Sequence, residues 1–290
     1  VDLGRELDNY HGLYRHVVAD AGDVDLWMIA GPDPLAVTRR FTWLTGRPAL
    51  MPRWSLGYSG STMSYTDAPD AAVQMASFLD QCARHDLGCT SFHLSSGYTS
   101  IGDKRYVFHW NRDKFPDPAA FIGSYADAGV RLVPNIKPAL LRSHPRYDEA
   151  AAAGLFVADA EGQPVEAQFW DEVGSYIDFT RPEAAQWWRA QVTTSLLDQG
   201  MEATWNDNNE HEVWDRRARF HGFGSPVAAA AMRPVQPLLM TRASRQAQIE
   251  ARPGQRPYVV TRSGMAGLQR YAQTWTGDNR TEWKTIRYTI

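Results

Sequence analysis

Two short segments of the chain combine carboxylates with tryptophan in a way that could do chemistry. In the first, an apolar stretch ends at Trp205 and is followed by five polar residues that include Asp207 and Glu210. In the second, Trp275 lies three residues before Asp278, in the sequence Trp-Thr-Gly-Asp-Asn. Taken singly, each segment is equally well explained as a polar loop whose Asp and Asn side chains form turns or cap a helix.

Taken together, the two segments fit the cleavage of a glycosidic bond. That reaction needs two carboxyl groups flanking the bond, one acting as nucleophile and one delivering a proton. A tryptophan face can stack on a sugar ring, and an arginine such as Arg262 can bond to sugar hydroxyls. The pattern therefore indicates Asp207 and Asp278 as a candidate catalytic pair.

With these segments in place, the chain resembles glycoside hydrolase family 31, which includes α-glucosidases, α-xylosidases and related transglycosylases. The family's nucleophile motif, Trp-x-Asp-Met-Asn-Glu, matches residues 205–210, and its acid/base motif, Trp-x-Gly-Asp-Asn, matches residues 275–279. The family's sugar-binding arginine opens an Arg-Ser segment sixteen residues before the acid/base, which is the spacing from Arg262 to Asp278. Family segments also match residues 51–58 and 115–118, and the resemblance runs over roughly residues 10–290.

The resemblance implies a retaining α-glycosidase that hydrolyses terminal α-linked sugars by double displacement, through a covalent glycosyl-enzyme. Asp207 would attack the anomeric carbon, and Asp278 would protonate the leaving oxygen. Arg262 would position sugar hydroxyls, and Trp205 and Trp275 would form walls of the sugar site. The remaining substrate-binding candidates are Asn208, Glu210, Lys137 and Ser96. Neither a metal nor an organic cofactor is implied.

Three positions depart from the family pattern and bear on the substrate. The family's Leu-Asp-Ile-Asp after the second strand is Leu-Ser-Ser-Gly at residues 94–97, and the Met after the nucleophile is Asn208. After the third strand stands Lys137, where relatives often carry an Asp. The site thus loses a carboxylate and gains a cation, which puts ordinary α-glucosidase specificity in doubt. A negatively charged or otherwise modified sugar is one alternative, and a Lys137 that merely pairs with an acid is the other.

Two other functions would use the same residues. A transglycosylase shares the first half-reaction and passes the sugar to another sugar instead of to water. A non-catalytic carbohydrate-binding barrel would keep the fold, but Asp207 would then lie on a shallow surface instead of in a deep pocket. The presence of both carboxylates argues against such a decayed site.

The elements that must position these residues alternate between strands and helices. The sequence predicts strands at residues 54–58, 89–94, 130–136, 203–207, 258–261 and 272–275, and helices at 68–85, 118–128 and 182–199. Such alternation predicts a parallel sheet. Polar residues follow nearly every strand, as they do at the active-site face of a (β/α) barrel. We therefore predict the α/β class and a (β/α)8 TIM barrel, in preference to a doubly wound sheet whose ligands gather at one switch point.

The N-terminal part of the chain has a different pattern. Residues 1–30 are predicted to be β-rich, with apolar runs that include Val17, Val18 and residues 24–29. Asp33 can cap a helix through about Leu44. We predict that residues 1–48 are the tail of a β-sandwich domain with a linker helix, and that 49–290 are the catalytic barrel. Because the family carries two more strands beyond this point, the barrel is expected to be truncated after about six strands and the chain to be a fragment.

Composition narrows the classes of partner. The 290 residues carry a formal net charge of −3 and no basic stripe, which argues against a nucleic-acid partner. No apolar run is long enough to predict a membrane span. Cys82 and Cys89 are too few for a metal site or a disulfide framework, so reduced thiols and a cytoplasmic location are expected. The expected partner is a carbohydrate substrate, and the sequence leaves a homo-oligomer open.

Overall fold

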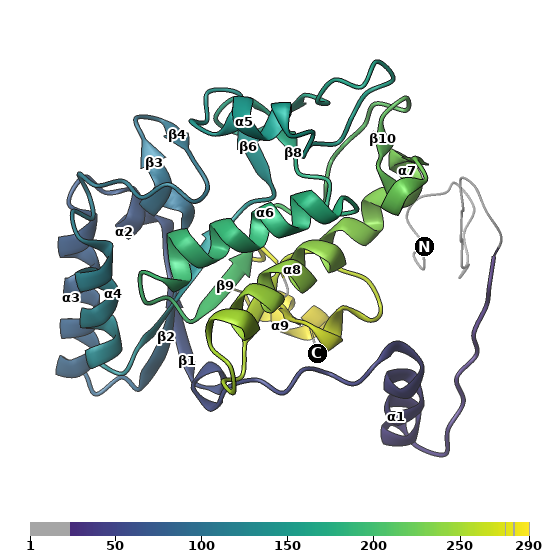
Figure 1. The fold of residues 1–290 in the computed structure, drawn as a ribbon. Coiled ribbons are helices and arrows are strands. Elements are labelled where there is room, and N and C mark those ends of the chain that lie inside the picture. The colour runs from purple at the N-terminus through teal and green to yellow at the C-terminus, as the bar shows by residue number, and fades with distance from the viewer. Residues whose placement is uncertain (1–23, 276, 281, 290) are drawn as a thin grey trace. The chain divides into compact units, whose positions relative to one another are not determined.

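The computed structural model describes residues 24–275, 277–280 and 282–289 (Figure 1). The chain divides into two compact units, residues 1–41 and 42–290. In the first unit, residues 24–31 form no helix or strand, so the strand predicted within 24–29 is wrong; these apolar residues have no neighbouring strand to pair with among the described residues. Val17, Val18 and the rest of the predicted β-rich stretch lie outside the described residues, and the β-sandwich assignment stays a prediction.

The predicted linker helix is present as α1 (Pro34–Thr45). Its first turn is capped as expected, because Oδ1 of Asp33 accepts a hydrogen bond from the backbone N–H of Ala36 at 2.8 Å. Gly46 follows the helix with a φ of +106°, a left-handed conformation that glycine adopts without strain. The short-range signals of sequence therefore located both ends of this helix.

The second unit is built on one sheet of six parallel strands. Along the sheet their order is β1 (Tyr58–Ser61), β2 (Cys89–Leu94), β5 (Arg131–Ile136), β9 (Ala203–Asn206), β12 (Tyr258–Thr261) and β13 (Gln273–Thr274). The order in the sheet is the order along the chain, as in the wall of a (β/α) barrel. In a doubly wound sheet the order in which successive strands are added reverses at a switch point. The order observed among the described strands has no such reversal, so the barrel prediction is confirmed.

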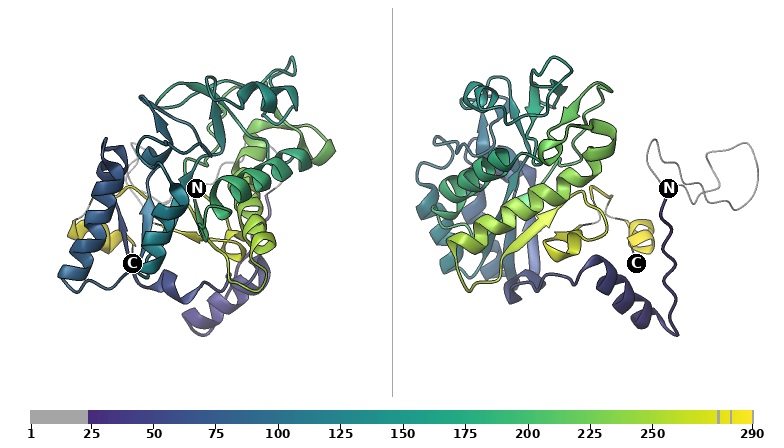
Figure 2. Two further views of the ribbon diagram at one scale, coloured as in Figure 1. Left: turned by 60° about the vertical axis from the view of Figure 1, so that its left-hand side comes forward. Right: turned by 45° about the vertical axis from the view of Figure 1, so that its right-hand side comes forward.

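Four longer helices make the crossovers between successive strands. They are α3 (Ala71–Arg84), α4 (Pro118–Asp127), α6 (Pro182–Val192) and α8 (Gln236–Ala251). The views agree that α3 lies beside α4, and α6 beside α8 (Figure 2). Buried hydrogen bonds join each pair: Tyr125 Oη donates to the carbonyl of Met75 at 2.7 Å, and Trp188 Nε1 donates to Ser244 Oγ at 2.9 Å. These bonds hold the crossover helices together in pairs.

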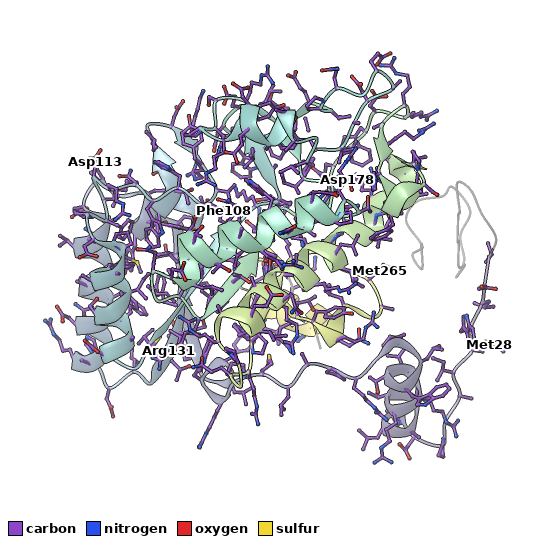
Figure 3. All side chains as sticks on the ribbon, viewed as in Figure 1. Met28, Phe108, Asp113, Arg131, Asp178 and Met265 are labelled. Atoms are coloured by element: carbon purple, nitrogen blue, oxygen red, sulfur yellow. The ribbon has the colours of Figure 1, made fainter. Side chains whose placement is uncertain are left out.

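Aromatic packing fills the space between these helices and the sheet. Phe108, labelled in Figure 3, packs edge-on against Trp188 of α6 with ring centroids 4.8 Å apart. Trp188, Phe92 and Tyr125 are all at most 1% exposed. Arg131, also labelled, pairs with Glu202 at 3.0 Å at the amino ends of β5 and β9. This ion pair thus joins the amino ends of two neighbouring strands of the sheet.

The first predicted strand is displaced in the structure. Residues 53–56 form a 3₁₀ turn, η1 (Arg53–Leu56), and the strand begins at Tyr58. The strand residues Tyr-Ser-Gly-Ser have little apolar content. Their conformation is therefore determined by pairing with β2 and not by their intrinsic strand propensity. A side chain at Gly60 would collide with Phe78 and Phe92, which explains why the strand carries a glycine there.

Other differences concern short elements. The predicted helix 68–85 is preceded by a separate one, α2 (Met63–Asp67), and the predicted helix 182–199 changes to a π-helical turn (Thr193–Leu197) after Val192. Four further helices were not expected from the sequence pattern: α5 (Tyr147–Ala152), α7 (Ala229–Met232), α8 and α9 (Trp283–Thr289). Two antiparallel strand pairs were also not expected. One joins β3 (Ser100–Ile101) to β4 (Lys104–Arg105), and the other joins β10 (Arg219–Phe220) to β11 (Val227–Ala228). Strands of two residues are too short to produce a readable alternation.

The largest of these excursions is a small sheet between β5 and α6. It contains β6 (Ala139–Leu141), β8 (Val173–Tyr176) and β7 (Ala167–Gln168), in that order and all antiparallel. It stands at the carboxyl end of the barrel strands (Figures 1 and 2). Its β7–β8 hairpin therefore reaches the place where a barrel binds its ligands.

Two further sequence-based expectations concern simple features. Cys82 and Cys89 are free thiols, as predicted. Within the described ranges, no helix is long and apolar enough to cross a membrane.

Candidate active site

A pocket with an empty volume of about 820 Å³ opens at the carboxyl ends of β2, β5 and β9. A neighbouring hollow shares much of its lining, so we treat the two as one site and call it the central pocket. The shared residues are Ser96, Arg105, Asn135, Lys137, Trp170, Asp171 and Asn208. Of the residues predicted from sequence, all but Trp275 line the central pocket.

Asp207 is held from several directions at the end of β9. Its backbone N–H donates to the carbonyl of Ile136 at 2.9 Å, which continues the pairing of β5 with β9. Its Oδ2 accepts a hydrogen bond from Asn135 Nδ2 at 2.9 Å, and Arg262 Nη1 lies 3.4 Å from its Oδ1. The side chain is only 13% exposed. This carboxylate is therefore fixed in one orientation at the floor of the pocket.

Arg262 connects the acidic groups of the site. Its Nε and Nη2 donate to the two carboxylate oxygens of Glu210 at 2.8 and 3.0 Å, a bidentate pair. The same pair raises the pKa of Arg262 above its ordinary value. Burial works to raise the pKa of Glu210, but the Arg262 guanidinium outweighs it and the pKa is lowered. Glu210 thus orients the arginine, while the third nitrogen, Nη1, points to Asp207.

Asp278 follows β13 on the opposite side of Arg262. Gly277 precedes it with a φ of +88°, which allows the turn. Oδ2 of Asp278 lies 3.8 Å from Arg262 Nη1, the same nitrogen that lies 3.4 Å from Asp207 Oδ1. The two carboxylate oxygens are therefore no farther apart than the sum of these distances. Such a bound is compatible with the spacing of about 5–5.5 Å typical of retaining glycosidases, and it overlaps only the lower part of the range of roughly 6.5–9.5 Å typical of inverting ones.

Trp205 forms one side of the site, whereas Trp275, which the sequence predicted as a second wall, does not line the pocket. Trp205 lines the central pocket, and Trp275 packs against it edge-on with centroids 5.6 Å apart. His93 contacts the Trp205 ring on another side, also at 5.6 Å, and its Nδ1 lies 2.7 Å from Ser59 Oγ. Burial lowers the pKa of His93 to about 4, so this ring is neutral near pH 7. Trp275 and His93 thus support the wall that Trp205 presents.

The loop after β9 owes its shape to buried hydrogen bonds. Asn209 is fully buried, and its Nδ2 donates to Thr261 Oγ1 at 2.8 Å while its Oδ1 accepts from the backbone N–H of Ser263 at 3.0 Å. These bonds tie the loop that carries Asp207 to the loop that carries Arg262. Asn208 has a φ of +47° and faces the pocket.

Lys137 and Ser96 occupy the positions where the sequence departs from its relatives. Ser96 is buried in the turn η2 (Ser96–Thr99), and Lys137 follows β5. Both line the central pocket. Burial lowers the pKa of Lys137, an effect that Asp207 and Asp171 partly offset. Among the described residues, no hydrogen bond or ion pair engages its ammonium group.

Of the seven residues that line both hollows, four were not predicted as site residues. Asn135 could have been found, because it precedes Lys137 by two positions and a strand places such residues on the same face. Arg105, Trp170 and Asp171 come from the β3–β4 and β7–β8 hairpins, which left no signal in the sequence. Arg105 is bound to Asp171 at 3.3 Å and to Asp67 at 3.1 Å. Within the described part of the chain, no cluster of three or more His, Cys, Asp or Glu side chains could hold a metal ion.

Comparison with known proteins agrees with this geometry. Residues 48–290 match the model of the "Glycosyl hydrolases family 31 TIM-barrel domain". Alpha-glucosidase 2 of Bacillus thermoamyloliquefaciens is 30% identical over 281 residues, covering 94% of this chain and 35% of that protein. Human neutral alpha-glucosidase C is 30% identical over 294 residues, covering 95% of this chain and 30% of that protein. The chain therefore belongs to glycoside hydrolase family 31.

Solved structures agree on the fold. The glucosidase II alpha subunit bound to Glc1Man2 superposes with a TM-score of 0.77 at 25% identity, covering 88% of this chain and 28% of that one. A Flavobacterium johnsoniae GH31 dextranase complexed with glucose gives a TM-score of 0.78 at 23% identity, covering 90% and 32%. The chain spans about a third of the length of the relatives it matches.

Proposed function

We propose that the protein is a retaining α-glycosidase that hydrolyses terminal α-linked sugars by double displacement. The observation that carries the proposal is the position of Arg262 Nη1, which lies 3.4 Å from Asp207 and 3.8 Å from Asp278. Both carboxylates line one pocket, and the sum of these two distances is compatible with the spacing of about 5–5.5 Å that a retaining mechanism uses, which supports the proposal. The α-linkage is supported by the relatives, whose names include alpha-glucosidase 2 and neutral alpha-glucosidase C.

The two carboxylates have different roles in this mechanism. Asp207 attacks the anomeric carbon, and the bond to the leaving oxygen breaks as Asp278 gives that oxygen its proton. Water then attacks the glycosyl-enzyme and loses a proton to Asp278, which releases the sugar and restores both groups. The burial of Asp207 suits a nucleophile that must stay in line with one carbon. Asp278 lines the same pocket, so it can reach the leaving oxygen of a sugar that is bound there.

The mechanism is tested by the configuration of the first product. The full-length protein is assayed against aryl α-glucosides, α-xylosides, α-galactosides, α-N-acetylgalactosaminides and α-sulfoquinovosides, and the reaction is followed by proton NMR. We expect the α-anomer of the free sugar to appear before mutarotation. A β-anomer as first product contradicts retention. An added sugar acceptor that is glycosylated faster than water reacts would identify a transglycosylase with the same first step.

A further inference from the structure

Three cations line the central pocket, and two of them are engaged by protein groups. Arg105 is bound by Asp171 and Asp67, and Arg262 by Glu210 and Asp207. The third, Lys137, has no such partner among the described residues. It lines both hollows that make up the pocket, next to the floor that holds Asp207. A half-buried charge without a partner is costly, and proteins normally pair such groups.

The nearest acids attract Lys137 by charge but are bonded to other groups. Asp207 Oδ2 accepts a hydrogen bond from Asn135, and its Oδ1 lies 3.4 Å from Arg262 Nη1. Asp171 is held by the backbone N–H of Arg105 at 3.0 Å and by the Arg105 guanidinium. The plainer alternative raised by the sequence, that Lys137 pairs with an acid, is thus not realised among the described residues. Lys137 thus contributes a cation to the lining of the pocket that no acid of the described residues binds directly.

The neighbouring strand end supplies no compensating charge. The loop after β2 presents the neutral side chains of Ser95 and Ser96 to the pocket. This side of the pocket therefore combines hydroxyl groups with one cation. A ligand group that lies here gains a charge-assisted hydrogen bond if it offers an oxygen acceptor, and such bonds are about twice as strong as neutral ones.

We infer that Lys137 is a specificity-determining residue, which binds a sugar substituent whose oxygen is a stronger acceptor than a hydroxyl. The chemistry is that of an amide carbonyl or an acid oxygen, as in an acylamino sugar, a uronic acid or a sulfonated sugar. The inference rests on the proposed function, because it assumes that the sugar lies beside Asp207. It goes beyond that function by stating which sugars the pocket selects.

The test compares substrates that share one aryl leaving group in the full-length protein. We expect kcat/KM for at least one substituted α-glycoside to exceed that of the unsubstituted glycoside. Lys137→Met keeps the aliphatic stem and removes the charge. It should lower the ratio of kcat/KM for the substituted glycoside to kcat/KM for the unsubstituted one roughly ten- to hundredfold, the loss expected for a hydrogen bond to a charged group. Lys137→Arg should retain most of the preference if the substituent is an acid. Added salt should weaken binding of an acid substituent but not of a neutral amide.

A matched control removes a charge outside the pocket. Lys104 pairs with Glu172 at 2.9 Å and does not line the pocket. Lys104→Met should leave the ratio between substrates unchanged. Preference of the wild type for the unsubstituted glycoside, or equal loss on every substrate in Lys137→Met, overturns the inference.

A binding measurement separates this inference from the catalytic proposal. Calorimetric titration of N-acetylgalactosamine, a glycuronic acid, sulfoquinovose and glucose into an Asp207→Asn variant requires no turnover. Tighter binding of a substituted sugar that disappears on adding Lys137→Met supports the role of Lys137 even if no glycoside is hydrolysed. Equal affinity for all four sugars contradicts it, whatever the enzyme assays show.

Discussion

The two candidate catalytic carboxylates have similar sequence surroundings and very different structural ones. Asp207 is 13% exposed and is fixed by strand pairing, an Asn135 hydrogen bond and Arg262. Asp278 is 84% exposed and lies 3.8 Å from Arg262. Asp207 is held from both sides, because β9 lies between β5, which carries Asn135, and β12, which Arg262 follows. A motif thus specifies which residue is present, and the neighbouring strands decide how firmly it is held.

The largest loss of activity should come from replacing Asp207, the more firmly held of the two carboxylates. Asp207→Asn preserves the shape of the side chain but removes the nucleophile, and we expect kcat on aryl α-glycosides to fall by roughly 10⁴-fold or more. Thermal unfolding should shift little by comparison. Asp113→Asn, at an exposed position outside the pocket, is the control and should keep full activity. Retention of more than about a tenth of wild-type activity in Asp207→Asn would mean that the nucleophile is wrongly assigned.

The exposed side should give an effect that depends on the leaving group. Asp278→Ala removes the proton donor, so we expect hydrolysis of disaccharides to slow by roughly 10²- to 10⁴-fold, while glycosyl transfer from a dinitrophenyl donor or a fluoride is spared. Azide should then attack the intermediate without a base and yield the α-glycosyl azide, detectable by mass spectrometry and NMR.

Equal losses on good and poor leaving groups, with no azide product, would remove the general-acid role of Asp278. It would leave Asp278 as a group that only positions substrate or loop. The contrast between the two carboxylates would then be one between a chemical group and a binding group.

The smallest effect concerns stability on the fixed side. His211 is fully buried behind Glu210, and burial lowers its pKa to about 4 although two backbone carbonyls lie near its ring nitrogens. In the unfolded chain the pKa is about 6.5, so between pH 6.5 and 4 the unfolded state binds more protons. The free energy of unfolding should therefore fall as the pH drops through this window, by up to about 3 kcal/mol for this residue.

The measurement is urea unfolding at a series of pH values for wild type and His211→Asn, since Asn tolerates the φ of +52° at this position. Burial lowers the pKa of His93 to about 4 as well. The single variant should therefore remove only part of the dependence of the free energy of unfolding on pH. An unchanged slope in His211→Asn would show that His211 takes up its proton equally readily in both states.

Sequence predicted the parts of the site that obey the barrel rule. Asp207, Arg262 and Lys137 each follow an apolar strand, and parallel strands bring their carboxyl ends to one edge. Asn135 was within reach of the same reasoning. Trp170 and Asp171 were not, because they come from a hairpin whose strands are two and four residues long. Their place depends on tertiary contacts, such as Asp171 with Arg105, between segments far apart in the chain.

Burial and pairing could not be predicted from the sequence either. Glu210 was expected to bind substrate, and the structure shows it engaged with Arg262 as well as bordering the pocket. The contacts of Asp207 with Asn135 and Arg262 join residues far apart in the chain, and only the assembled sheet brings them together.

The left-handed backbone of Asn208 limits how this site can change by mutation. At a φ of +47°, Gly, Asn and Asp are tolerated, whereas other side chains cost about 1–2 kcal/mol before any contact with a sugar is considered. In a library that carries every amino acid at this position, many variants would therefore be destabilised by their backbone conformation, whatever their effect on substrate binding. A larger side chain at this position must first relax this turn, so new specificities would be reached more readily through Lys137 or Ser96.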